Sequence, residues 1–172
     1  MKKNNSTNSN VTSMVATVST AVAGVENSNL TPTIEREVRS IFDALTLKAA
    51  DNMVVTLDRP RRGESNRGTI KVFRRADVDR QRAEEIALRN FIREGGNPRD
   101  VAKPRRAVPV MVYVFYPSIY DNRRLGSVAI YGSDAGMMGS WLKRSRSLFG
   151  RTVLSTTFEH GIEPFVSVKF AA

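Results

Sequence analysis

The chain repeats one residue pattern at a fixed spacing, and this repeat limits the folds that it can adopt. Residues 53–91 align without gaps on residues 111–149. Each copy shows an alternating apolar run, a loop with arginines, a second alternating run and then helical spacing. The repeat therefore predicts two ββα units, at about 53–94 and 111–149. Simple alternation in β-rich segments is the other explanation, because the copies agree in pattern more than in identity.

The first unit has two β-rich runs on either side of a long basic loop. Residues 53–59 and 69–75 alternate in hydrophobicity, and the loop 60–68 between them is rich in Gly and Arg. This arrangement is typical of a β-hairpin with a long tip. The helical spacing that follows begins near Asp77, a candidate N-cap, and ends before the Gly95-Gly96 pair. We expect one apolar stripe of this helix to face the core: Ala83, Ala87, Leu88, Phe91 and Ile92.

The second unit begins with the most hydrophobic run of the chain. Residues 108–116 predict a central strand that is buried on both faces. After the loop 117–126, a strand at 127–131 and a helix at 133–149 complete the unit. The helical spacing predicts five inward residues: Met138, Trp141, Leu142, Ser145 and Phe149.

A helix and a hairpin complete the predicted domain at its two ends. Thr31-Pro32, a hydroxyl N-cap followed by proline, predicts the start of a helix that ends near Ala50. Residues 152–158 and 165–170 flank a turn and predict a C-terminal β-hairpin. The expected fold class is α+β: an antiparallel sheet built from two ββα units plus this hairpin, preceded by the N-terminal helix.

Residues 1–30 differ in composition from the rest of the chain. They are rich in Asn, Ser, Thr and Val, which is typical of a flexible arm, and we expect residues 31–172 to form a single α+β domain with an internal duplication. A weak signal peptide is the alternative, because Lys2 and Lys3 precede an apolar-leaning stretch. Hydroxyl residues interrupt that stretch, so an intracellular location, or one within a virion, is favoured over secretion.

Charge is the strongest compositional signal. The chain has 27 basic and 17 acidic residues, a net charge of +10, and twenty of the basic residues are arginine. Arginine forms bidentate contacts with phosphate and stacks on bases, so polyanions are the expected partners. No segment pairs a long apolar face with a lysine-rich face, and we therefore expect no membrane partner.

The residue inventory argues against catalysis. The chain has no cysteine and one histidine, which excludes thiol nucleophiles, zinc-thiolate sites and histidine-rich metal sites. The glycine-rich segment 132–136 matches no nucleotide-binding motif. Glu159, His160 and Glu163 are the best candidates for a metal or acid–base site, but a turn accounts for them equally well. We expect no catalytic residues, no bound metal and no cofactor.

Three groups of residues are candidate nucleic-acid contacts. Arginines of the two hairpin tips can straddle a phosphate backbone, and a tyrosine beside them can stack on bases. A basic connector between the units and the outer face of the helix predicted at 133–149 are further candidates. A solvated surface is the alternative for each. At the tips the residues are Arg59, Arg61, Arg62, Arg67, Tyr120, Arg123 and Arg124. In the connector they are Arg105 and Arg106. In the helix predicted at 133–149 they are Lys143, Arg144 and Arg146.

These features predict a non-enzymatic nucleic-acid-binding protein that contacts phosphates through its arginine-rich hairpin tips. Single-stranded DNA or RNA is favoured over duplex, because no recognition helix or zinc module is evident. We expect the protein to work as a homo-oligomer. The alternative is a structural subunit of a viral or phage particle or of a ribonucleoprotein assembly, and a metal-dependent nuclease is a third hypothesis.

Overall fold

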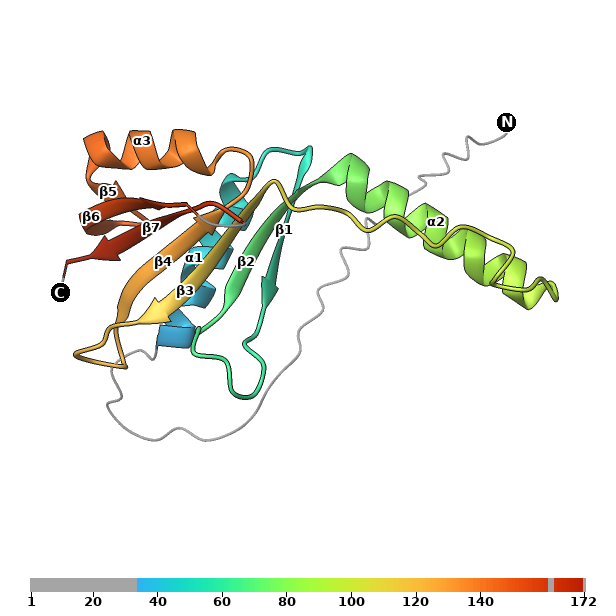
Figure 1. Cartoon of the computed structure of the whole chain (residues 1–172), viewed down its shortest axis with the longest axis horizontal. Helices are drawn as coiled ribbons and strands as arrows, with labels where there is room; N and C mark the ends of the chain where they lie inside the picture. Colours follow the sequence, from blue (N-terminus) through green and yellow to red (C-terminus); the bar gives the residue numbers. More distant parts are fainter. Residues whose placement is uncertain (1–33, 161–162, 172) are drawn as a thin grey trace, which may run out of the picture.

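A computed structural model describes residues 34–160 and 163–171 (Figure 1). In these residues three helices accompany one curled antiparallel sheet of seven strands, which confirms the α+β fold class. The helices are α1 (Ile34–Lys48), α2 (Arg75–Arg93) and α3 (Ala135–Ser145). The strands are β1 (Met53–Asp58), β2 (Thr69–Arg74), β3 (Met111–Pro117), β4 (Leu125–Tyr131), β5 (Ser147–Leu148), β6 (Arg151–Glu159) and β7 (Phe165–Phe170). The arm predicted at 1–30 lies outside the described residues.

The sheet contains the two predicted ββα units and the C-terminal hairpin. Its strand order is β1-β2-β3-β4-β7-β6-β5, with every neighbouring pair antiparallel. The β1–β2 and β3–β4 hairpins lie side by side as a meander. The last hairpin continues the sheet through β7, which pairs with β4, so the end of the chain extends the sheet that the repeats begin.

One face of the sheet carries the core. A continuous row of buried side chains crosses four strands, because Ile70 lies opposite Tyr113, Tyr113 opposite Ile130, and Ile130 opposite Val166. The neighbouring residues of each strand point to the other face, as the period of two requires. The strand predicted to be buried on both faces therefore has one buried face only: β3 begins at Met111 and alternates between buried and half-buried residues.

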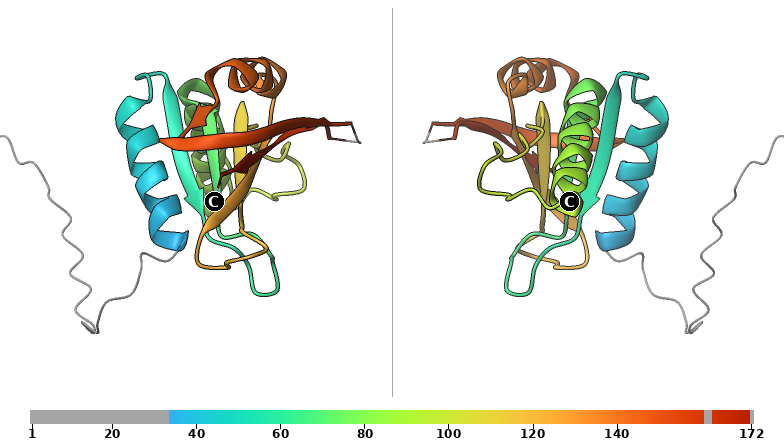
Figure 2. Two further views of the ribbon diagram at one scale, coloured as in Figure 1. Left: turned by 90° about the vertical axis from the view of Figure 1, so that its left-hand side faces the viewer. Right: turned by 90° about the vertical axis from the view of Figure 1, so that its right-hand side faces the viewer.

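Helix α1 spans the open side of the curled sheet. Its apolar stripe, Ile34, Val38 and Ile41, is buried against the inner face. Val38 contacts the first hairpin closely, since a Cβ on Gly68 would lie 3.1 Å from Val38 Cγ1. At the opposite edge Arg151 Nη2 of β6 donates to Glu37 Oε1 at 2.7 Å. Figure 2 shows α1 beside β1, with the start of β6 close to the helix.

Helix α3 packs on the inner face at β6 and β7. Its buried residues are Ala135, Gly139 and Leu142. A Cβ on Gly139 would lie 2.9 Å from Val166 Cγ2, so the missing side chain lets the helix approach β7 closely. The stripe predicted for this helix is correct in part. Met138 and Phe149 pack against the core with Leu142, whereas Trp141 and Ser145 are exposed. The helix ends at Ser145 because Arg146 adopts a left-handed backbone conformation, with φ of 50°.

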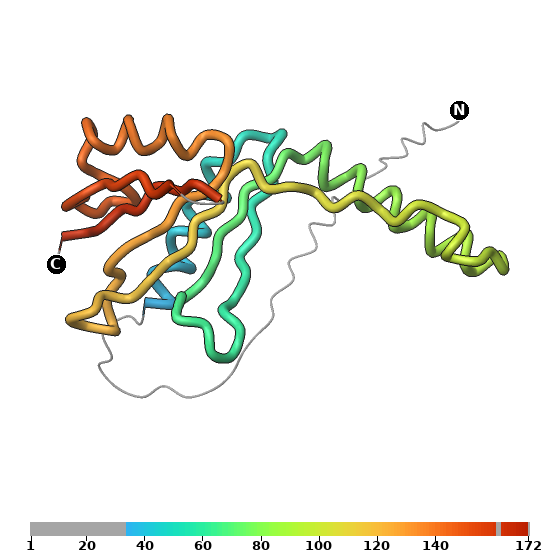
Figure 3. Tube along the Cα trace, viewed as in Figure 1, coloured from blue at the N-terminus to red at the C-terminus, as the bar shows by residue number. Residues whose placement is uncertain are grey.

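Helix α2 projects away from the sheet (Figures 1 and 3). It has no buried residue, so the predicted inward stripe was wrong: Leu88 is half-buried and the other four residues are exposed. Connector 94–110 folds back along the helix instead. There the backbone N–H groups of Arg105 and Ala107 donate to the side chains of Glu84 and Gln81, both at 2.7 Å.

One backbone angle distinguishes the two units. Gly132 follows β4 with a φ of +122°, and this conformation turns the chain back so that α3 covers the sheet. Arg74 occupies the same position of the repeat in the first unit, and its φ is −72°. The chain therefore continues from β2 into α2, which begins at Arg75, ahead of the predicted cap at Asp77, and runs outward.

We expect the Val38→Ala substitution to lower the free energy of unfolding by about 2 kcal/mol, because it removes buried methyl groups and leaves a cavity. Leu47→Ala is the matched control on the same helix: Leu47 is 87% exposed, and its truncation should change stability by less than about 0.5 kcal/mol. Urea denaturation at constant m-value measures both. Equal losses for the two variants would contradict the position assigned to α1.

Candidate nucleic-acid interface

The two long hairpin tips lie at the same end of the sheet. Strands β1 and β3 are both antiparallel to β2 and so point in one direction, which places the loops that follow them side by side (Figure 1). Two backbone hydrogen bonds join the first tip to β3: the Arg67 N–H donates to the Phe115 carbonyl at 2.8 Å, and the Phe115 N–H donates to the Gly68 carbonyl at 3.1 Å. The tips are thus held in a defined mutual position.

The first tip is folded around the carboxylate of Glu64. Its Oε2 accepts hydrogen bonds from the backbone N–H of Arg61 at 3.0 Å and from Asn66 Nδ2 at 3.1 Å. Asn66 Oδ1 in turn accepts from the Gly68 N–H at 3.2 Å. The hydrogen bond from the Arg61 N–H, followed by that from Asn66, lowers the pKa of Glu64. This carboxylate therefore shapes the loop through its backbone.

The second tip is folded in the same way around short polar side chains. Asp121 Oδ1 accepts from the Arg123 N–H at 2.9 Å, and Ser118 Oγ accepts from the Tyr120 N–H at 3.2 Å. These turns leave Ile119 and Tyr120 almost fully exposed, at 89% and 92%. An exposed aromatic ring at a structured tip is suited to stacking on an unpaired base.

The guanidinium groups of the tips are largely free of acidic partners. Arg124 Nε lies 3.8 Å from Asp121 Oδ2, and Asp58, at the end of β1, pairs with Lys71. The other five arginines of the two tips form no ion pair within residues 34–160 and 163–171. These five are Arg59, Arg61, Arg62, Arg67 and Arg123. The end of the sheet thus carries a net positive charge, because its six arginines outnumber the carboxylates of Asp58, Glu64 and Asp121.

The remaining predicted residues lie on two other surfaces. Arg105 and Arg106 belong to the connector beside α2, beyond the opposite end of the sheet. Lys143 and Arg144 occupy the last turn of α3, and Arg146 follows it. Seven of the twelve predicted residues are therefore brought together at the tips, whereas five are separated from them.

Sequence reasoning missed an aromatic group on the outer face of the sheet. Tyr131 and Phe165 pair side by side in β4 and β7 with ring centroids 4.9 Å apart, and both are half-buried. Partial burial raises the pKa of Tyr131, and Tyr116 and Glu163 add to the shift. Tyr116 lies on the same face next to the second tip, since it pairs with Ser127. The alternation of β4 placed Tyr131 on this face, but nothing in the sequence indicated its pairing with β7.

The described residues offer no cluster of metal ligands. Within them no group of three His, Asp or Glu side chains could hold an ion. Glu159, His160 and Glu163 are exposed, and the His160 ring packs against Phe158 with centroids 4.8 Å apart. No helix in this part of the chain combines the length and apolar content that crossing a bilayer requires.

Comparison with protein-family models, with curated proteins and with solved structures gives no match to this chain. The functional interpretation accordingly depends on the geometry and charge of the described residues.

We expect Glu64 to titrate below the usual glutamate pKa of about 4.3. Because its pKa is lowered in the folded protein, the stabilisation that Glu64 gives to the tip is fully present above that usual value and is lost as the pH falls through the lowered one. NMR titration of the Glu64 carboxyl and the Arg61 amide measures both events. Asn66→Ala should raise the Glu64 pKa toward the usual value, and a midpoint at or above 4.3 in the unmodified protein would contradict this description.

Proposed function

We propose that this protein is a non-enzymatic nucleic-acid-binding protein that contacts phosphates through its paired hairpin tips. The observation that carries this proposal is the position of six arginines on two adjacent structured loops, five of them without an ion-pair partner in the described part of the chain. Guanidinium groups that form no ion pair are available for bidentate contacts with phosphate oxygens. The tips then act as one surface, because hydrogen bonds to β3 link them.

Exposed aromatic rings favour a single-stranded partner. Tyr120 projects at the second tip, and Tyr116 continues the aromatic surface onto the outer face of the sheet. Unpaired bases can stack on such rings whatever their identity, whereas a duplex keeps its bases inside. The proposed partner is therefore single-stranded DNA or RNA, bound by phosphate neutralisation and base stacking and without strong sequence preference.

We expect a fourfold variant, with Arg61, Arg62, Arg123 and Arg124 each changed to Gln, to bind single strands weakly. Each lost phosphate contact removes about 0.7 from the slope of log K against log salt concentration, so the slope should fall by about 3 at most. Fluorescence anisotropy with labelled single- and double-stranded DNA and RNA across a salt titration measures this slope.

The matched control changes four exposed basic residues of the projecting arm, Arg82, Arg89, Arg99 and Lys103, to Gln. It alters the net charge equally and leaves the tips intact, so its slope should stay near that of the unmodified protein. Equal losses in the two variants would assign binding to overall charge and overturn the role of the tips. Tyr120→Ala separates stacking from charge, because it should lower the affinity for single strands while leaving the salt slope unchanged.

A second candidate function is that of a structural subunit in a particle or ribonucleoprotein assembly, and one observation favours it. Helix α2 has 19 residues and none of them is buried. Isolated helices of this length are marginally stable in water, and most helices in proteins depend on packing of an apolar face. The arm formed by α2 and its connector therefore suits a contact with another subunit.

The exposed face of α2 is self-complementary when two copies meet antiparallel. Ala83, Ile86 and Ala87 lie together on this face, and the small side chains allow close approach. A twofold axis at Ile86 places Asp79 of each copy opposite Arg93 of the other. Neither residue forms an ion pair in the part of the chain that the structure describes.

We expect concentration-dependent self-association without nucleic acid, which Asp79→Arg or Arg93→Asp alone weakens through like-charge repulsion. The double variant restores the opposite charges and should associate like the unmodified protein. Sedimentation velocity measures each species. A protein that stays monomeric, or a double variant that associates no better than the single ones, would contradict this interface.

A further inference from the structure

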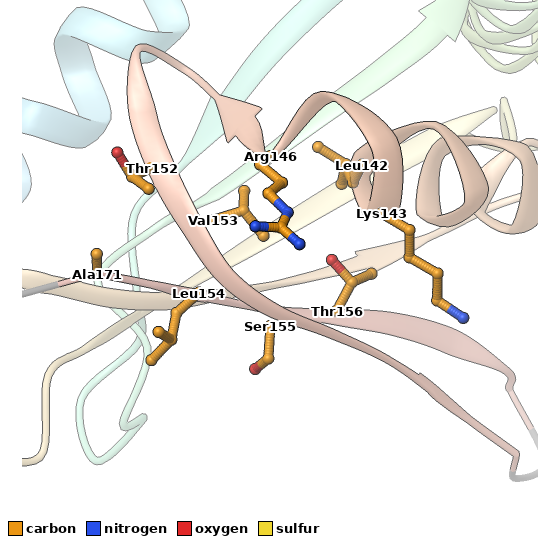
Figure 4. A pocket seen from close by; sticks show the side chains of 9 residues that line it. All are labelled: Leu142, Lys143, Arg146, Thr152, Val153, Leu154, Ser155, Thr156 and Ala171. Carbon is orange, nitrogen blue, oxygen red and sulfur yellow. The ribbon is translucent and has the colours of Figure 1, made fainter.

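A cavity lies between the C-terminal turn of α3 and the start of β6, away from the hairpin tips. The cavity measures about 420 Å³. Buried Leu142 and Val153 are among the residues that line it, together with polar residues of both elements (Figure 4). Its size suits a small organic ligand better than a single ion.

All the charged residues that line this cavity are basic. Lys143 and Arg146 line it, and no acidic residue does so. Neither side chain forms an ion pair within residues 34–160 and 163–171. The cavity therefore presents two uncompensated cations to a ligand.

The backbone of Arg146 is held in place by both walls of the cavity. Its N–H donates to the Leu142 carbonyl at 3.0 Å, and its carbonyl accepts from the Val153 N–H at 2.9 Å. These bonds keep Arg146 at a φ of 50°, a conformation that residues other than glycine adopt at a cost. Figure 4 shows the guanidinium group directed over the cavity between α3 and β6.

The third polar group is a hydroxyl without a partner. Thr156 Oγ1 is buried and forms no hydrogen bond. The side chain points from β6 toward Lys143 and Arg146 in Figure 4. A buried hydroxyl that lacks a hydrogen bond is unusual in a folded protein. The exposed side chains of Lys143 and Arg146 lie beside it, and a ligand oxygen held by them can accept a hydrogen bond from this hydroxyl.

We propose that this cavity binds a phosphate monoester, with Lys143 and Arg146 neutralising the phosphate and Thr156 donating a hydrogen bond to one of its oxygens. A monoester carries a charge of about −1.5 to −2 at neutral pH, which matches two cations. The cavity volume leaves room for an attached sugar or base. The monoester can belong to a free nucleotide or to the 5′ end of a nucleic-acid chain.

The test is a titration of the full chain with inorganic phosphate, with uridine 5′-monophosphate and with uridine. NMR monitors the backbone amide signals of residues 152–156 during each titration. The two phosphates should shift these amides and uridine should not. Short oligonucleotides with a 5′-phosphate or a 5′-hydroxyl distinguish the two sources of the monoester. Tighter binding of the 5′-phosphorylated oligonucleotide indicates the end of a nucleic-acid chain. If both oligonucleotides bind equally weakly and uridine 5′-monophosphate binds tightly, the ligand is a free nucleotide.

Substitutions of Lys143 and Arg146 test whether the phosphate binds in this cavity. Lys143→Gln and Arg146→Asn should each weaken monophosphate binding about tenfold or more, because each removes a charge-assisted hydrogen bond. Asparagine tolerates the left-handed backbone conformation, so the second variant keeps the turn. Arg144→Gln is the matched control, because Arg144 shares the helix turn but does not line the cavity. An equal loss with Arg144→Gln, or no loss with the other two, would overturn the proposal.

Thr156→Val provides a readout that does not depend on charge. It removes a hydroxyl that has no partner in the free protein, so the melting temperature should stay the same or rise while monophosphate binding weakens. A lower melting temperature with unchanged binding would overturn the role of Thr156. These variants leave the hairpin tips unchanged, and the tip variants leave this cavity unchanged. Failure of the monophosphate proposal therefore does not imply failure of the proposed binding at the tips.

Discussion

The curl of the sheet depends on α1, which connects the first strand to the sixth. Val38 packs beside Gly68 on the first hairpin, and Glu37 receives a hydrogen bond from Arg151 at the other edge. Helices α1 and α3 together cover the inner face, and the row from Ile70 to Val166 is excluded from water. The apolar burial that stabilises the domain is thereby confined to one face. Charged loops can then extend from the end of the sheet without crossing the core.

This separation explains how a small domain tolerates twenty arginines. The tips take their shape from backbone hydrogen bonds to polar side chains such as Asp121 and Glu64, and five of their six guanidinium groups form no ion pair in the described residues. Like charges repel across a few ångströms, but exposed tips are well solvated and screened by salt. The arrangement concentrates charge where a polyanion can reach it and keeps it away from the apolar interior.

Much of the architecture was predictable because alternation of period two survives in the strands. The residues 53–59, 69–75 and 165–170 correspond to β1, β2 and β7 within a residue or two, and the tips followed from Gly, Pro and Arg between them. The direction of α2 was not predictable, since its apolar stripe resembles that of a packed helix. The cavity at Thr156 was also missed, because it requires a hydroxyl of β6 to meet the end of α3, and no local pattern encodes that contact.

The contrast between Gly132 and Arg74 has a further consequence for the two units. After these two positions the helices lie differently: α3 packs on the sheet and α2 projects from it. Substitutions in α3 must preserve a close approach to Val166, whereas α2 has no buried residue and its truncation leaves no cavity in the core. Most exposed positions of the projecting helix can therefore change at little cost in folding stability, whereas Gln81 and Glu84 hold the connector. The second unit thus contributes its helix to the core, whereas the first unit presents its helix to solvent.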